Sequence, residues 1–292
     1  MKLATFVLND KQRVGALTEQ GLVPFAAGPA SDVADLIRLG ADGVRLRDML
    51  VATMPAIDPA SVSFLPPILT PPKIICVGLN YADHTKESKY EQPDYPTLFL
   101  RVATSLIGDG AVLERPLCSD SLDFEGELAV VLGSGGRHIA KERALDCVFG
   151  YSVFNDGSVR EYQFKSPQWT VGKNFDRTGA FGPYVVTADE LPAGAKGLLL
   201  QTRLNGEVVQ SANTDDMIYD VASLISILSG AITLQTGDVI VAGTPSGIGW
   251  AREPKLLMRD GDVVEVAIEN VGVLTNPVRD ESPSAAAAVG KR

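Results

Sequence analysis

The 292-residue chain has few of the side chains that build disulfide frameworks and transition-metal sites. Its three cysteines, Cys76, Cys118 and Cys147, are odd in number and widely spaced, which suits neither a disulfide framework nor a zinc site. Two histidines, His84 and His138, are too few for an all-histidine metal site. These absences exclude sites built from thiolates or from imidazoles alone.

Positive charge and long apolar runs are also scarce. The chain has 36 acidic and 26 basic residues, a formal net charge of −10, and no Lys/Arg stripe that could neutralise phosphates. No apolar run approaches the roughly 20 residues that a membrane span needs. The first strand-like run meets Asn9 and Asp10 too soon for a signal peptide. We therefore expect a cytoplasmic protein that binds neither nucleic acid nor a membrane.

What is present is an ordinary globular composition, 45% hydrophobic and 21% charged, long enough for one large domain with a small appendage. Short strand-like runs lie at residues 3–8, 14–18 and 22–25. Residues 32 to about 54 follow a helical spacing of apolar side chains. The proline-rich stretch 55–73 predicts a linker, because proline fixes extended backbone and stops helices. Residues 1–70 are thus predicted to form a small N-terminal α/β module.

Residues 71–279 are dominated by short strand candidates and predict a second, catalytic domain. The runs rich in β-branched and aliphatic residues are 74–77, 128–132, 185–186, 198–204, 239–242 and 263–268. Asn205-Gly206 predicts a hairpin. Helices are expected only at about 82–88, 141–145 and 218–228. The fold class predicted is α+β with strands dominant, and the Ser/Ala/Pro-rich tail 280–292 is expected to be disordered.

Three carboxylates in this domain suggest a metal site. Glu125 and Glu127 are two residues apart, which on a strand places both on one face. Asp156 follows the apolar run 149–154 and should end a buried strand, where a carboxylate needs a partner or a metal. An exposed edge strand with alternating charge is the competing interpretation for the two glutamates. Hard cations such as Mg²⁺ prefer oxygen ligands of this kind.

Basic and amide side chains follow the carboxylates along the chain. Lys173 has aromatic residues on both sides, which suggests a partly buried ammonium that serves chemistry on an anionic substrate. Arg160 and Gln163 stand four and seven residues after Asp156, on one face if the segment is helical. A surface lysine and a surface salt bridge are the competing interpretations for Lys173 and Arg160.

His84 and Glu87 form the remaining candidate pair. At i and i+3 on a helix they could hydrogen-bond, and an imidazole oriented by a carboxylate is a competent general base near neutral pH. A surface ion pair on a short helix is the competing interpretation.

Five sequence blocks, in this order, resemble the fumarylacetoacetate hydrolase family over about residues 73–278. The blocks are Ile75–His84, Asp123–Val131, Asn155-Asp156 with Arg160 and Gln163, Gln168–Lys173, and Val241–Gly247. The first 70 residues resemble, less specifically, the extra module of the longer bacterial members.

The resemblance implies a mixed β-roll and a homodimer. It also implies Mg²⁺ or Mn²⁺ held at the positions of Glu125, Glu127 and Asp156, with Lys173 as the active-site lysine.

By the same resemblance, Arg160, Gln163 and Thr244 would face the substrate. His84 and Glu87 match the dyad on a mobile lid helix that activates water in hydrolytic members. The chain departs from the family where Arg101-Val102 replaces the usual Lys-Pro. That block lies close to the site in such folds, so Arg101 is a further candidate for substrate contact.

The function predicted is metal-dependent hydrolysis of a C–C bond in an acylpyruvate or 2,4-dioxo acid through a metal-bound enolate. The alternative is decarboxylation or keto–enol isomerisation of a related 2-oxo diacid, of the oxaloacetate or hydroxymuconate type, without attack by water. A non-catalytic binding protein is a third hypothesis, which predicts no dependence on a divalent metal.

Overall fold

The computed structural model describes residues 1–25, 30–40, 55–88, 91 and 94–282. The strands are β1 (Lys2–Leu8), β2 (Lys11–Thr18), β3 (Gly21–Pro24), β4 (Ser63–Leu65), β5 (Ile74–Gly78), β6 (Thr97–Arg101), β7 (Leu106–Ile107), β8 (Leu113–Arg115), β9 (Leu122–Asp123), β10 (Gly126–Leu132), β11 (Val148–Asp156), β12 (Ser158–Val159), β13 (Gly179–Thr187), β14 (Leu199–Leu204), β15 (Glu207–Asn213), β16 (Val239–Val241), β17 (Val263–Ile268) and β18 (Gly272–Asp280). The helices are α1 (Val33–Arg38), α3 (Ala82–Glu87), α4 (Lys141–Ala144), α5 (Arg160–Gln163) and α6 (Val221–Ala231).

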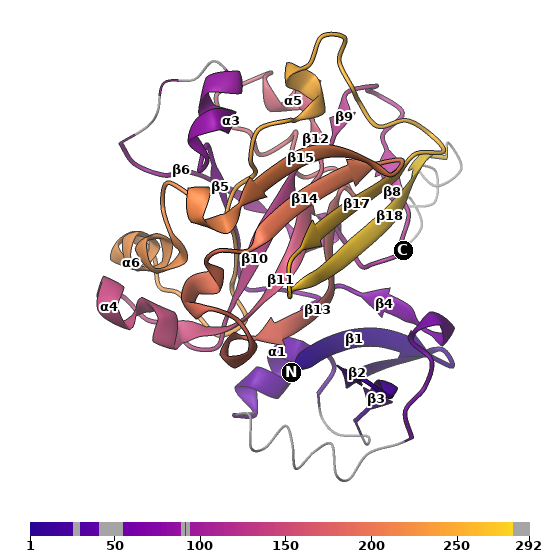
Figure 1. Ribbon diagram of the computed structural model, residues 1–292, viewed down its shortest axis with the longest axis vertical. Coiled ribbons are helices and arrows are strands. Elements are labelled where there is room, and N and C mark those ends of the chain that lie inside the picture. The colour runs from indigo at the N-terminus through magenta and orange to yellow at the C-terminus, as the bar shows by residue number, and fades with distance from the viewer. Residues whose placement is uncertain (26–29, 41–54, 89–90, 92–93, 283–292) are drawn as a thin grey trace, which may run out of the picture.

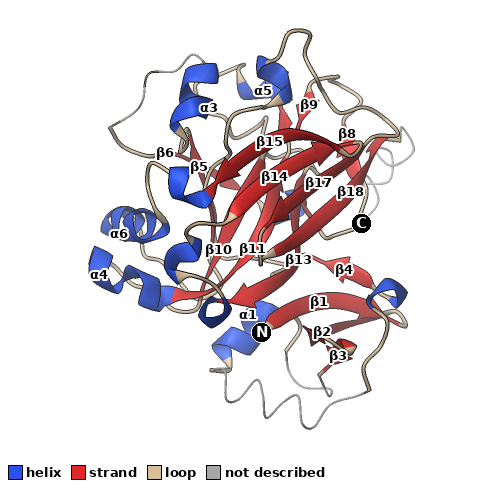
Figure 2. Cartoon of the chain, in the orientation of Figure 1, coloured by secondary structure: helices blue, strands red, loops and turns tan. Residues whose placement is uncertain are grey.

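Strands dominate the described chain, as Figure 2 shows, and they form two main sheets. The large sheet follows the order β3-β2-β1-β13-β11-β10-β16-β5-β6, with β4 beside β1 and β7 beside β13. The smaller sheet has the order β15-β14-β17-β18-β8 and lies over the large one (Figure 1). The prediction of an α+β fold rich in strands is confirmed.

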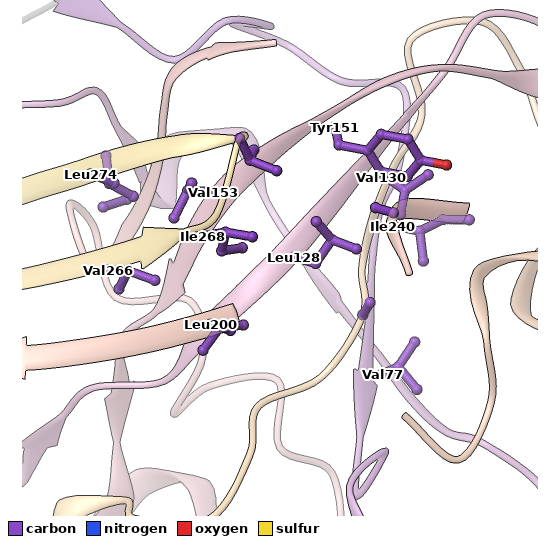
Figure 3. Packing of buried hydrophobic residues seen from close by; sticks show 14 of the residues in the cluster. Val77, Leu128, Val130, Tyr151, Val153, Leu200, Ile240, Val266, Ile268 and Leu274 are labelled. Atoms are coloured by element: carbon purple, nitrogen blue, oxygen red, sulfur yellow. The ribbon is translucent and has the colours of Figure 1, made fainter. Parts of the chain in front are cut away.

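The main hydrophobic core lies between the two sheets. Leu128 of β10 points toward side chains of the smaller sheet such as Leu200 and Ile268 (Figure 3). In the same cluster, Val130 lies beside Tyr151 and Ile240. Alternate residues of β10 point to the opposite face, because side chains alternate along a strand. The large sheet is therefore buried on both sides.

The N-terminal residues cover part of that opposite face. Leu3 and Leu36 pack there in one cluster with Val131, Phe181 and Val185. Strand β1 also pairs antiparallel with β13, with Leu3 opposite Val185. The first strands are thus continuous in sheet and core with the strands that follow residue 71, as Figure 1 shows at its lower end.

Several predicted elements are confirmed and others need correction. Asn205-Gly206 turns the β14–β15 hairpin, with both residues at positive φ. The helix expected from residue 32 ends at Arg38, because Gly40 follows at φ 72°, a conformation that stops helices. Residues 41–54 lie outside the described chain.

The proline-rich stretch is more than a linker, since it contains β4, in which Leu65 pairs with Thr5 of β1. At the other end, β18 extends to Asp280, and residues 283–292 of the expected tail lie outside the described chain. Among the described residues, none of the helices has both the length and the apolar character needed to cross a bilayer.

Candidate metal centre and active site

The three predicted carboxylates converge at one end of the large sheet. Glu125 directly precedes β10, Glu127 lies in it, and Asp156 ends β11. Antiparallel pairing places Glu127 opposite Phe154, so the start of β10 meets the end of β11. One oxygen from each of the three carboxylates lies within 4.8 Å of the others, and all three side chains are buried.

Two buried cations bind Glu125. The Nζ of Lys173 lies 2.7 Å from one Glu125 oxygen and 2.7 Å from Oδ2 of Asp156. Nη1 of Arg160 lies 2.6 Å from the other Glu125 oxygen. Burial alone would raise the pKa of Glu125, but these cations outweigh it and lower the pKa to about 2. Glu125 is therefore ionised.

The pKa of Glu127 shifts in the opposite direction to that of Glu125. In the described chain it has no cation within salt-bridge distance, and its Oε2 accepts one hydrogen bond from the backbone of Gly243 at 2.6 Å. Burial, then the charges of Asp156 and Glu125, raise its pKa well above the usual range.

The site as a whole has an excess of buried negative charge. It contains four buried carboxylates and three buried cations: Asp123, Glu125, Glu127 and Asp156 against Arg101, Arg160 and Lys173. An excess charge on Glu127, close to two other carboxylates, is what a bound cation would neutralise. The donor set consists only of oxygens, which fits Mg²⁺ or Mn²⁺.

Arg160 begins the short helix α5, and Gln163 ends it. The predicted helical face does not include Asp156, because that residue belongs to β11. Arg160 instead donates through Nε to Asp123 at 2.9 Å and through Nη1 to Gln163 at 2.8 Å. Its Nη2 is buried without a hydrogen-bond partner in the described chain. A buried, unpaired guanidinium nitrogen is a ready donor for an anionic ligand.

Asp123 is a site residue that the sequence reasoning missed. Its carboxylate is fully buried and accepts backbone hydrogen bonds from Gly249 and Trp250, both at 2.9 Å, besides the bond from Arg160. Asp123 therefore joins Arg160 to the loop that follows Thr244. The signal was present, since Asp123, Glu125 and Glu127 alternate with the period of a strand.

His84 and Glu87 both lie on helix α3, as predicted. His84 is buried, and its Nδ1 is 3.6 Å from a Glu87 oxygen, which is longer than a hydrogen bond. Both oxygens of Glu87 lie 3.0 Å from the backbone nitrogen of Gly247. The imidazole is thus beside a carboxylate that the Gly247 loop holds in place.

A cavity of about 360 Å³ is lined by most of these groups, but not by Asp156 or Asp123. The predicted site residues that line it are His84, Glu87, Glu125, Glu127, Arg160, Gln163, Lys173 and Thr244. Aromatic walls come from Phe99, which packs on Trp169, and from Phe164, which packs on Trp250. The cavity therefore combines a charged floor with apolar sides, as small-molecule sites do.

Arg101 was a candidate for substrate contact, but the structure places it elsewhere. Its side chain is fully buried and does not line the cavity. Its Nη1 atom contacts the Oδ1 atom of Asp156.

Comparison with known sequences agrees with this geometry. The family model described as "Fumarylacetoacetate (FAA) hydrolase C-terminal" matches residues 73–279. The chain is 40% identical over 233 residues to the mitochondrial oxaloacetate tautomerase Fahd2a of Rattus norvegicus, an alignment that covers 80% of this chain and 74% of that protein.

Solved structures show the same fold. The fumarylacetoacetate hydrolase of Exiguobacterium antarcticum is 35% identical, with a TM-score of 0.84, and the match covers 96% of this chain and 100% of that one. The maleylpyruvate hydrolase of Sphingobium sp. SYK-6, solved with manganese(II) and pyruvate, is 29% identical, with a TM-score of 0.79 and coverage of 97% and 100%.

Proposed function

Because this chain belongs to the fumarylacetoacetate hydrolase family, we propose that it is a divalent-metal-dependent enzyme that cleaves a C–C bond in an acylpyruvate or another 2,4-dioxo acid. The observation that carries the proposal is the convergence of three buried carboxylates, Glu125, Glu127 and Asp156, with Lys173 and Arg160. All of these residues except Asp156 line one cavity. A metal site next to unpaired cationic donors suits a small anionic substrate.

Glu125, Glu127 and Asp156 would hold the metal. When bound, Mg²⁺ or Mn²⁺ would stabilise the negative charge that develops on the 2-oxygen of the substrate. Arg160 would bind the substrate carboxylate through Nη2, which is buried and unpaired in the described chain. Asp123 would keep the guanidinium in that orientation, since it holds Nε at 2.9 Å.

Lys173 and His84 would manage protons and charge. Burial would lower the pKa of Lys173, but Asp156 and Glu125 raise it above its usual value, so the ammonium would act as a donor to an oxyanion. His84 would take a proton from water, which adds to the distal carbonyl. The C–C bond then breaks, the electron pair stays on the pyruvate fragment, and a proton completes pyruvate and a carboxylic acid.

Keto–enol tautomerisation of a 2-oxo diacid such as oxaloacetate is the second candidate. It is favoured by the name of the rat relative, an oxaloacetate tautomerase that is 40% identical. The same carboxylate triad, Arg160 and Lys173 would serve this reaction, because it also builds charge on the 2-oxygen. It differs in moving a proton at the neighbouring carbon without adding water.

A substrate panel tests the proposal. The purified protein would be assayed with Mg²⁺, with Mn²⁺ and with EDTA, on acylpyruvates and on enol-oxaloacetate. The proposal expects metal-dependent release of pyruvate from an acylpyruvate, and a loss of at least about 10²-fold in kcat for His84→Ala, the usual range for removing a general base.

The outcomes separate the two candidates. Turnover of oxaloacetate tautomers alone, with no pyruvate released from any acylpyruvate, would replace the first candidate by the second. No metal-dependent turnover of either class would remove both. His138→Ala is the matched control, since His138 does not line the cavity and should leave kcat unchanged.

The assembly and the metal belong to the same proposal. We propose Mg²⁺ or Mn²⁺ as the cofactor and a homodimer as the assembly. The outer strand β6 supports a dimer, since it leaves Leu98 and Leu100 exposed and Val102 follows, also exposed. Light scattering on a size-exclusion column would measure the mass. The cytoplasmic location stays a prediction.

A further inference from the structure

A buried arginine on β6 occupies the far side of the metal-site aspartate. Arg101 contacts Oδ1 of Asp156 through Nη1, which also donates to the carbonyl of Gly157 at 3.1 Å. The other oxygen, Oδ2, faces Lys173 at 2.7 Å. Each oxygen of Asp156 therefore contacts a different buried cation, Arg101 at Oδ1 and Lys173 at Oδ2.

The guanidinium itself is fixed by further contacts. Its Nη2 donates to the hydroxyl of Thr178 at 2.9 Å, and its Nε donates to the hydroxyl of Ser105 at 3.3 Å. The ring of Phe154 lies 5.8 Å away on one side. A planar group bound along several directions has little freedom to rotate, unlike a lysine ammonium.

Asn174 joins the strand that carries Arg101 to the loop that carries Lys173. Its Nδ2 donates to the carbonyl of Leu100 at 2.9 Å, and its Oδ1 accepts from the backbone nitrogen of Val102 at 2.6 Å. The backbone is thus bound on both sides of Arg101 by the residue directly after Lys173. Asn174 therefore fixes the position of Arg101 relative to Lys173, and these are the two cations that contact the two oxygens of Asp156.

We propose that Arg101 is a positioning residue for Asp156: it fixes Oδ1 so that Oδ2 points into the carboxylate triad, and Asn174 maintains this alignment. Arg101 does not line the cavity, so it acts through Asp156 and not on the substrate. The inference rests on the proposed metal site.

The change in metal affinity when Arg101 is removed distinguishes two roles for this residue: orienting Asp156, or only compensating its charge. A fixed positive charge near a divalent cation repels it, so removing the charge alone would tighten metal binding. Loss of a group that orients a ligand weakens binding, typically about 10- to 100-fold. The two roles therefore predict opposite changes in metal affinity.

Calorimetric titration with Mn²⁺ tests the inference without any assay of turnover. We expect Arg101→Met to bind Mn²⁺ about 10- to 100-fold more weakly than the wild type. Arg101→Lys should fall between the two, since one ammonium cannot reach both Asp156 and Thr178 as the fork does. Asn174→Ala, which leaves the buried ion pair intact, should show a smaller loss in the same direction.

The matched control is Arg203→Met, which removes a partly exposed arginine paired with Glu265 in the smaller sheet and should leave the affinity unchanged. Unchanged or tighter binding in Arg101→Met and Asn174→Ala would overturn the inference alone. If Arg101→Met does not fold, the affinity of Asn174→Ala decides. A wild type that binds no Mn²⁺ would overturn the proposed metal site and this inference with it.

Discussion

Two glutamates only two residues apart show how local partners decide charge. Glu125 has Lys173 and Arg160 beside its oxygens, and its pKa falls to about 2. Glu127 is equally buried, but burial together with the charges of Asp156 and Glu125 outweighs the opposing charge of Lys173, and its pKa rises. Residue type and burial are the same in both cases, so the difference comes from the neighbours. Glu127 is the carboxylate whose charge a metal would balance.

Glu127→Gln should therefore change how stability depends on pH. A carboxyl group whose pKa is higher in the folded than in the unfolded state stabilises the folded state only while the group is protonated. The metal-free wild type should lose stability as pH rises above the usual glutamate pKa of about 4.3, until the raised pKa is passed. The variant cannot ionise, so this loss should disappear. Melting temperatures in EDTA from pH 5 to pH 8 measure it.

Added Mg²⁺ gives the second half of this test. In the wild type the melting temperature should rise with Mg²⁺, more at pH 8 than at pH 5, because the ligand must be ionised. Glu127→Gln should lose most of this rise, whereas Glu265→Gln, in the smaller sheet, should keep it. An equal Mg²⁺-induced rise in wild type and Glu127→Gln would contradict the assignment of Glu127 as a ligand.

At the scale of elements, the pairing of strands brings the site residues together. A strand that forms because of its neighbours is hard to predict from its own sequence. Runs of β-branched residues identified β5, β10, β16 and β17. They did not identify the full length of β13, which contains Gly179, Gly182 and Pro183 and forms between β11 and β1. Glycine and proline weaken the local strand signal. Pairing with two neighbours overrides that weak local preference.

The site was predicted residue by residue but not in its contacts. The carboxylates, Lys173 and Arg160 were predicted as site residues, partly through a family resemblance, and the structure brings them together. Asp123 was missed although it alternates with Glu125 and Glu127, because its contacts with Arg160 and with the backbone of Trp250 cannot be read from that spacing. Asn174 was missed because its role depends on backbone groups far away in sequence, such as that of Leu100. Such contacts exist only after the chain has folded.

The loop that holds Glu87 offers a test at this scale. Gly247 has φ +105°, and a Cβ there would lie 2.2 Å from the carbonyl oxygen of Val209. Gly247→Ala should therefore lower the free energy of unfolding by about 1–3 kcal/mol, the usual cost of such strain. It should also lower kcat in any reaction that uses His84, because a loop that shifts to relieve this clash would move the backbone N–H of residue 247 away from Glu87. Urea unfolding and steady-state kinetics measure the two effects.

Gly206→Ala is the matched control for this loop. Gly206 also has a positive φ, +84°, but a Cβ there would have no atom within 4 Å. Only the conformational cost of about 1–2 kcal/mol should remain, with kcat unchanged. If both variants keep full kcat, the Gly247 loop does not position Glu87.

At the scale of the whole molecule, the N-terminal strands and the site share one sheet. Strand β1 continues the order of strands into β13, β11 and β10, the last two of which carry Asp156 and Glu127. Leu3 and Val185 are paired across β1 and β13 and are fully buried in one cluster. A shared sheet and a shared core predict that the two parts unfold together.

Leu3→Ala tests this cooperativity. Removal of a fully buried leucine should cost about 2–5 kcal/mol. Both tryptophans, Trp169 and Trp250, belong to the part of the chain after residue 71 and line the cavity, so their fluorescence reports on the surroundings of the site. If sheet and core are continuous, the fluorescence midpoint in urea should shift as far as the midpoint by circular dichroism. Leu117→Ala, at an exposed leucine, should move neither by more than about 0.5 kcal/mol. An unchanged fluorescence midpoint in Leu3→Ala would instead mean that the first 70 residues unfold as a unit of their own.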